Sequence, residues 1–244
     1  MSSGGGMGTD DDRAVSFAHA LATLKEQGSA LLVVGTVPEE MYDSASTQML
    51  GDPDADDPRR RLVVTTRSER QSAHDKLRST GPLTPDFARL VTRNSPARSA
   101  AATTASGTKT LPKTDVVEGS VADLGTTISN VLEEFDLFAD GLDPAELRVA
   151  FDCLSTLLTE YDRETVFRFV HVLTTQIRRI GGLAHFRLPR DPSSELVRLF
   201  SPLFDATIHL RLDGTQLKQQ WHFRDRDLVS DWLPLERREE STGT

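Results

Sequence analysis

The chain has 244 residues, 37% of them hydrophobic, so it is long enough to bury a full core in one large domain. Its net charge of −9 argues against a nucleic-acid binder held by phosphate contacts and against docking on an anionic membrane surface. Cys153 is the single cysteine, no apolar stretch approaches the ~20 residues that span a bilayer, and no secretory signal is visible. For these three reasons we expect a cytoplasmic protein.

Hydrophobic periodicity predicts alternating helices and strands through the first half of the chain. In chain order we expect a disordered tail over 1–12, a helix over 15–27 that ends at Gly28, a buried strand over 30–34, a helix over 37–50, an acidic loop over 51–58, and strands over 61–66 and 87–92. The second helix is predicted to start with a capping box of Thr36 and Glu39. The Ser, Thr, Ala and Pro content of residues 94–115 predicts a loop or linker, with a short helix over 97–104 as an alternative.

The second half continues the alternation and ends in a hairpin. We expect a helix over 121–138, a turn over 141–144, a strand over 147–151, a helix over 164–180, a strand over 183–188, a short helix over 194–203, and strands over 206–212 and 216–223. This order predicts one α/β domain over 13–235, in which helices flank a mostly parallel central sheet that an antiparallel hairpin closes. Residues 236–244 predict a flexible tail.

Two features of the predicted sheet bear on function. The ligand crevice of a parallel sheet lies at the carboxyl ends of its strands, which places Gly35, Thr66, Arg67 and Asp152 along one rim. Near the chain end, the aromatic residues around Trp221 either pack over the sheet edge or form a subunit or partner interface.

Three phrases carry a resemblance to a known family: GSALLVVG at 28–35, LRVAFDCL at 147–154 and DLVSDWLP at 227–234. With the order of elements, they resemble the RecA-like ATPases, within them the KaiC-type family, and most closely its divergent proteins from halophilic archaea. The resemblance covers about Ser16 to Trp232 and implies a RecA-like three-layer sandwich. It also implies a phosphate loop after the first strand and a magnesium-associated Asp after a later one.

The phosphate loop is degenerate. A working loop reads G-x-x-x-x-G-K-[ST], in which backbone N–H groups wrap the phosphates and the Lys neutralises them. Laid on Gly35, the pattern puts Glu40 at the second Gly, Met41 at the Lys and Tyr42 at the Ser or Thr. Glu39 and Glu40 also place negative charge at a helix N-terminus, where phosphate would otherwise be attracted.

The catalytic glutamate that the resemblance implies is also missing. Arg67 follows the matching strand and cannot act as a base, although Glu69 leaves rescue by a small shift open. Asp152 matches the magnesium-associated Asp. It is either a remnant metal or nucleotide contact, or a residue kept for folding as a helix N-cap or as the partner of Arg67. Gly35, Thr36 and Asp152 are therefore the candidate remnant nucleotide site.

These losses favour a non-catalytic RecA/KaiC-like module with a regulatory or signalling role through protein partners, and no required cofactor. Two alternatives stay open. One is a weak nucleotide binder or slow ATPase that uses Asp152 to hold ATP or ADP with magnesium. The other is a scaffold that assembles into a homo-oligomer through its sheet edges. The histidines show no ligand spacing, so no metal centre is expected.

Overall fold

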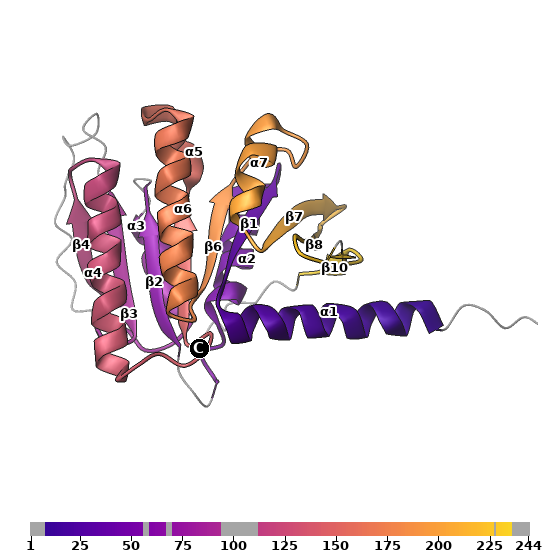
Figure 1. Cartoon of the computed structure of the whole chain (residues 1–244), viewed down its shortest axis with the longest axis horizontal. Helices are drawn as coiled ribbons and strands as arrows, with labels where there is room; N and C mark the ends of the chain where they lie inside the picture. Colours follow the sequence, from indigo (N-terminus) through magenta and orange to yellow (C-terminus); the bar gives the residue numbers. More distant parts are fainter. Residues whose placement is uncertain (1–7, 56–58, 67–69, 94–111, 227, 236–244) are drawn as a thin grey trace, which may run out of the picture.

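The computed structural model describes residues 8–55, 59–66, 70–93, 112–226 and 228–235 (Figure 1). Its helices are α1 (Gly8–Gln27), α2 (Glu39–Leu50), α3 (Arg70–Arg78), α4 (Val121–Ala139), α5 (Leu154–Glu160), α6 (Arg163–Arg179) and α7 (Glu195–Phe200), with a 3-10 turn, η2 (Ser201–Leu203). Its strands are β1 (Ser29–Gly35), β2 (Arg60–Thr65), β3 (Ala88–Arg93), β4 (Lys113–Val117), β5 (Leu147–Asp152), β6 (Leu183–Leu188), β7 (Ala206–Asp213), β8 (Gln216–Phe223), β9 (Leu228–Val229) and β10 (Leu233–Pro234).

The described strands form one sheet in the order β10-β8-β7-β1-β6-β5-β2-β3-β4, with β9 also paired to β8. Every pair from β4 to β7 is parallel, whereas β8 pairs antiparallel with β7, β9 and β10. This confirms the predicted α/β class, with a mostly parallel sheet and a C-terminal antiparallel hairpin. β1 lies between β6 and β7, so its neighbours come from the other end of the chain.

Helices cover both faces of the sheet and make three layers (Figure 1). On one face, helices α4 to α7 pack over a large apolar cluster that includes the stacked rings of Phe151 and Phe186, 5.3 Å apart. On the other face, α1 and α2 pack over Leu31 and Val33, and α3 packs over Val63. Because strand side chains alternate between faces, one strand such as β1 serves both layers.

Two helices, α1 and α2, begin two or more residues away from the expected position. α1 begins at Gly8, so residues 8–12 of the expected tail are helical, in keeping with the preference of acidic residues for a helix's first turns. The capping box is wrong, because Pro38 is the N-cap of α2 and no side-chain cap bond forms. Pro38 fixes an extended backbone directly before the helix (φ −55°, ψ 156°), and this leaves Thr36 outside the cap.

The sequence patterns missed five described elements: α3, α5, β4 and the two-residue strands β9 and β10. α3 is strongly polar, with Ala73 and Leu77 as its buried apolar side chains, and α5 has only seven residues. β4 is a partly exposed edge strand without an apolar run, and it turns residues 113–115 of the expected linker into sheet. The option of a helix over 97–104, the acidic residues 56–58 and the tails 1–7 and 236–244 lie outside the described residues.

The C-terminal aromatic residues pack within the fold. The Trp221 ring lies 6.1 Å from the ring of Phe17 on α1 and 5.9 Å from the ring of Phe223, so α1 packs against the hairpin. Trp232 lies under the guanidinium of Arg211 at 3.9 Å. Among the described helices, none is both long and apolar enough to cross a membrane.

Candidate functional site

The turn between β1 and α2 is short and internally bonded. The Gly35 N–H donates to the Arg190 carbonyl (2.9 Å), and its own carbonyl accepts the Tyr42 hydroxyl (2.7 Å). Gly35 has φ +148°, and a Cβ there would lie 2.5 Å from the Leu210 carbonyl oxygen. The glycine is therefore needed for the close approach of β7. Thr36 lies exposed in the turn.

Two backbone N–H groups of the turn, those of Gly35 and Met41, are already bonded within the chain. A phosphate loop binds its ligand with free backbone N–H groups. Here the Gly35 N–H is already bonded, and Glu40, at the position of the second loop glycine, is already part of α2. The Met41 N–H donates to the Pro38 carbonyl at 3.1 Å. The chain thus closes this turn on itself.

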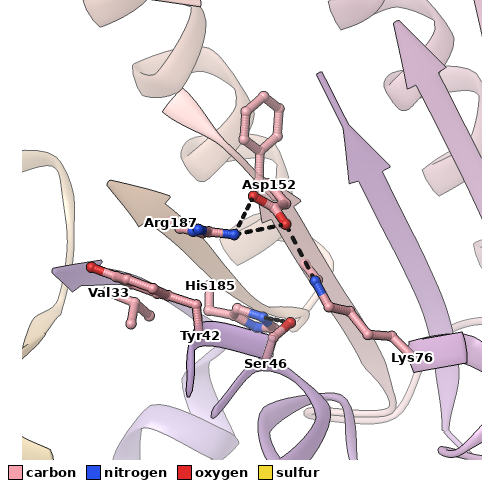
Figure 2. A pocket seen from close by; sticks show the side chains of 9 residues that line it. Val33, Tyr42, Ser46, Lys76, Asp152, His185 and Arg187 are labelled. Atoms are coloured by element: carbon pink, nitrogen blue, oxygen red, sulfur yellow. Dashed lines mark hydrogen bonds and ion pairs between the residues drawn. The ribbon is translucent and has the colours of Figure 1, made fainter. Parts of the chain in front are cut away.

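Asp152, at the end of β5, is held by two buried cations (Figure 2). Arg187 Nη1, from β6, donates to both carboxylate oxygens at 3.2 and 3.3 Å. Lys76 Nζ, from α3, donates to Oδ2 at 3.2 Å. The exposed fractions of the three side chains are 15%, 9% and 6% for Asp152, Arg187 and Lys76, so the cations take the place of solvent around the carboxylate.

Each cation also holds a second carboxylate. Arg187 bonds Glu39 at 3.1 Å, and Lys76 Nζ lies 2.7 Å from Asp43. Burial lowers the pKa of Arg187, but Asp152 and Glu39 outweigh it and raise that pKa overall. Three carboxylates thus surround two cations, so the cluster carries net negative charge. This charge opposes a phosphate as well.

Tyr42 closes the cluster from the α2 side. Its ring lies 4.5 Å below the guanidinium of Arg187, and burial raises the pKa of its hydroxyl, which keeps the group a neutral donor. The pocket between Tyr42, Asp152, Arg187 and their neighbours leaves about 10 Å³ for the centre of a water molecule. That is room for a single water, whereas ligand pockets usually measure ~300 Å³ or more.

His185 lies deeper on the same face of the sheet. Its Nε2 is 2.7 Å from the Ser46 hydroxyl (Figure 2). Burial lowers the pKa of His185 to about 3, aided by the charges of Lys76 and Arg148, so the imidazole is neutral and a weak base. The pair therefore does not amount to an activated nucleophile. Within the described ranges, no group of three or more His, Cys, Asp or Glu side chains could hold a metal ion.

The described residues of the predicted rim, Gly35, Thr66 and Asp152, lie at the same edge of the sheet, and Asp152 pairs with Arg187 and Lys76. The Thr66 N–H donates to the Asp152 carbonyl at 2.8 Å, as expected for neighbouring strand ends. The expected N-cap role is wrong, because Cys153 is the N-cap of α5. Arg67 and Glu69 lie outside the described residues.

Sequence reasoning missed the two cations. Arg187 alternates with His185 in an otherwise apolar strand, and that period of two was a signal for polar side chains on one face. Lys76 gave no such signal, because the helix that carries it was not recognised.

Comparison with known proteins gives a family and no activity. The model of a family described as a family of unknown function, DUF7504, matches residues 28–210. No curated protein matches the chain. The matched span includes Gly35, Asp152 and Arg187, whereas α1 and β8 lie outside it. Because the match covers most of the chain, the protein belongs to the DUF7504 family of unknown function.

Proposed function

We propose that this protein is a non-catalytic module of RecA-like architecture that acts through protein partners in a regulatory or signalling role. The observation that carries the proposal is the double ion pairing of Asp152 by Arg187 and Lys76. The acid that the resemblance assigns to magnesium is already ion-paired within the chain.

The sheet order supports the RecA-like part of the proposal. β1 and β5 are parallel and separated by β6 alone, so Gly35 and Asp152 end at the same edge of the sheet. This is where the resemblance expects a phosphate loop and a magnesium-associated acid to face each other. The strand order agrees with this expectation, and the internal ion pairs of Asp152 favour a module that does not use it for a ligand.

The energetics disfavour a nucleotide. To reach Asp152, a magnesium ion would have to displace both Arg187 and Lys76 and leave those buried cations without their shared acid. Breaking a buried pair by removing one partner costs about 3–5 kcal/mol. Such a cost lowers affinity by roughly 100- to 1,000-fold or more.

A nucleotide titration tests the non-catalytic part. We expect calorimetry with Mg-ATP and Mg-ADP at millimolar concentration to give no saturable heat, and phosphate release to equal that of a protein-free blank. A saturable heat, or turnover that Asp152→Asn abolishes while the exposed Asp75→Asn retains it, would overturn the proposal. Asp75 is a suitable control because its ion pair with Arg78 is solvent-exposed.

The size of the native complex tests the partner part. The chain weighs 26.9 kDa, so an unpartnered monomer has a defined elution position. We expect the endogenous protein, in a gently prepared extract, to elute in a larger complex whose other component is a different polypeptide. Elution at the monomer position, or as a complex of this chain alone, contradicts this part of the proposal.

A further inference from the structure

The C-terminal hairpin of β7 and β8 carries two stacked histidines. His209 of β7 lies opposite Gln220 and His222 of β8 lies opposite Thr207, so the two histidines are diagonal neighbours on one face of the hairpin. Their ring centroids are 3.9 Å apart and their ring planes differ by 25°. Both side chains are half-buried. The two imidazoles of this histidine pair are therefore in contact and partly shielded from water.

The groups beside the histidine pair are uncharged. Across the strands, Val34 of β1 is the neighbour of His209, and Val229 of β9 is the neighbour of His222. The Nε2 of His222 lies 3.1 Å from the Gln220 side-chain oxygen, which accepts a hydrogen bond from a ring N–H. Within the described ranges, no carboxylate forms an ion pair with either ring. A charge on these rings would thus have no described counter-charge in contact with it.

Charged side chains lie further along the two strands. Arg211 of β7 lies opposite Lys218 of β8, and Lys218 Nζ bonds Asp213 at 2.6 Å. At the start of β7, Asp205 holds Arg178 at 2.8 Å. These two acids already bond cations, and the like charges of Arg211 and Lys218 oppose any further positive charge on the histidine pair.

The rings of the pair are neutral at pH 7. Burial and the neighbouring His222 lower the pKa of His209 to about 4, and Asp191, after β6, offsets only part of this effect. One oxygen of Asp191 already accepts the N–H and the hydroxyl of Ser193. Burial lowers the pKa of His222 as well. A first proton would charge a partly desolvated ring, and a second would place a like charge 3.9 Å from it.

The strands that such a repulsion would separate are the last ones of the sheet. In the described structure, β8, β9 and β10 join the sheet through β7 alone. We propose that the stacked pair of His209 and His222 is a pH-sensitive contact that holds β8 against β7 at neutral pH and releases it in acid. The pair is separate from the Asp152 cluster, so the inference is independent of the proposed function.

Release would uncover an aromatic surface on the opposite face of β8. Trp221 and Phe223 pack there against Phe17 of α1, with ring centroids 6.1 and 5.8 Å from the ring of Phe17. The link strand of β9 and β10 is tied to the same region, because the Trp221 N–H donates to the Ser230 hydroxyl at 2.9 Å. Acid would therefore expose rings that neutral pH keeps packed.

Tryptophan fluorescence and circular dichroism of the full chain, followed against pH, test the proposal. The two tryptophans of the chain are Trp221 on β8 and Trp232 directly before β10, so both report on the released strands. Far-UV circular dichroism reports on the helices. Between pH 7.5 and 4.5 we expect the tryptophan emission to move to longer wavelength while the circular dichroism stays constant.

The direction of this change follows from proton linkage. A released imidazole titrates near pH 6.5, whereas the pKa of His209 in the stacked pair is about 4. The contact is therefore fully stable above about pH 6.5. As the pH decreases below this value, the ratio of released to closed molecules rises by up to about tenfold per pH unit for each ring.

Ring-preserving variants locate the effect. His209→Phe keeps an aromatic ring for stacking but cannot take up a proton, so we expect the emission change to shift by about one pH unit or more to lower pH, or to vanish. His222→Phe should act in the same way and serves if His209→Phe fails to fold. His171→Phe changes an exposed histidine on α6 and should leave the pH profile as it is.

Three results would overturn the inference. One is an emission spectrum that does not change down to pH 4.5. Another is an emission change that coincides with loss of the far-UV signal, since the whole fold and not the hairpin would then respond to acid. The third is a pH profile that both His209→Phe and His222→Phe leave unchanged.

Discussion

The two ends of one sheet face handle buried charge differently. At the carboxyl ends of β5 and β6, Asp152, Arg187 and Lys76 satisfy one another beneath α2 and α3. Toward the amino ends of β2 and β5, the buried Arg61 bonds only to carbonyl oxygens and the Thr80 hydroxyl, and the Nε of Arg148 beside it has no partner in the described residues. One end of the sheet therefore holds its cations with carboxylates, whereas the other end holds a buried cation with neutral oxygens. Ion pairing is concentrated at the end where the fold resemblance expects a ligand.

The largest effect should come from the paired end. Asp152→Asn leaves Arg187 and Lys76 buried without their shared charge, so we expect the free energy of unfolding to fall by about 3–5 kcal/mol. Urea unfolding measures it. Asp75→Asn, which removes an exposed ion pair, should change the same quantity by about 1 kcal/mol or less. If the two variants lose the same free energy of unfolding, the buried ion pairs of Asp152 contribute no more to stability than an exposed ion pair.

The second effect concerns His185, which lies between the two ends. Its pKa is about 3 in the folded protein and about 6.5 when exposed, so below pH 6.5 the unfolded chain binds the extra proton. The contribution of His185 to the free energy of unfolding is therefore fully present above pH 6.5. As the pH decreases below 6.5, this free energy decreases by about 1.4 kcal/mol per pH unit until the folded-state pKa is reached. Denaturant unfolding between pH 7 and 4.5 should show this slope, and His185→Gln should reduce it. If His185→Gln shows the same slope as the unchanged protein, other titratable groups cause the pH dependence.

The third effect has the opposite sign. Arg148→Met removes a half-buried charge whose Nε has no partner in the described residues and keeps the apolar stem, so the free energy of unfolding should rise by about 1 kcal/mol. Denaturant midpoints in chloride buffer measure this. If the variant instead loses stability as Asp152→Asn does, Arg148 is paired in solution and the contrast between the two ends disappears.

The smallest effect tests the turn after β1. Tyr42→Phe keeps the ring under Arg187 and removes the hydroxyl that bonds the Gly35 carbonyl, so stability should fall by about 1 kcal/mol. Thermal or urea unfolding is precise enough to see this. A turn that opens toward ligands in Tyr42→Phe would show itself as new heat on Mg-ATP titration, whereas we expect none.

The rim of the sheet was predictable, but the state of its residues was not. An apolar strand that ends in an acid places Asp152 at the carboxyl edge from sequence alone. Gly35 was also identified as a candidate site residue. The structure requires a glycine there because β7 approaches closely, and no local sequence pattern reveals that approach. The partners of Asp152 lie 35 and 76 residues away, so the pairing appears only when β6 and α3 are in place.

The central position of β1 has a consequence for how the protein is made. β1 leaves the ribosome well before both of its neighbours, β6 and β7, which are translated after residue 182. At usual rates of synthesis, β1 waits on the order of ten seconds for them. β1 is thus without both of its neighbours until β6 and β7 are translated, and the time for which it is open to aggregation depends on translation speed.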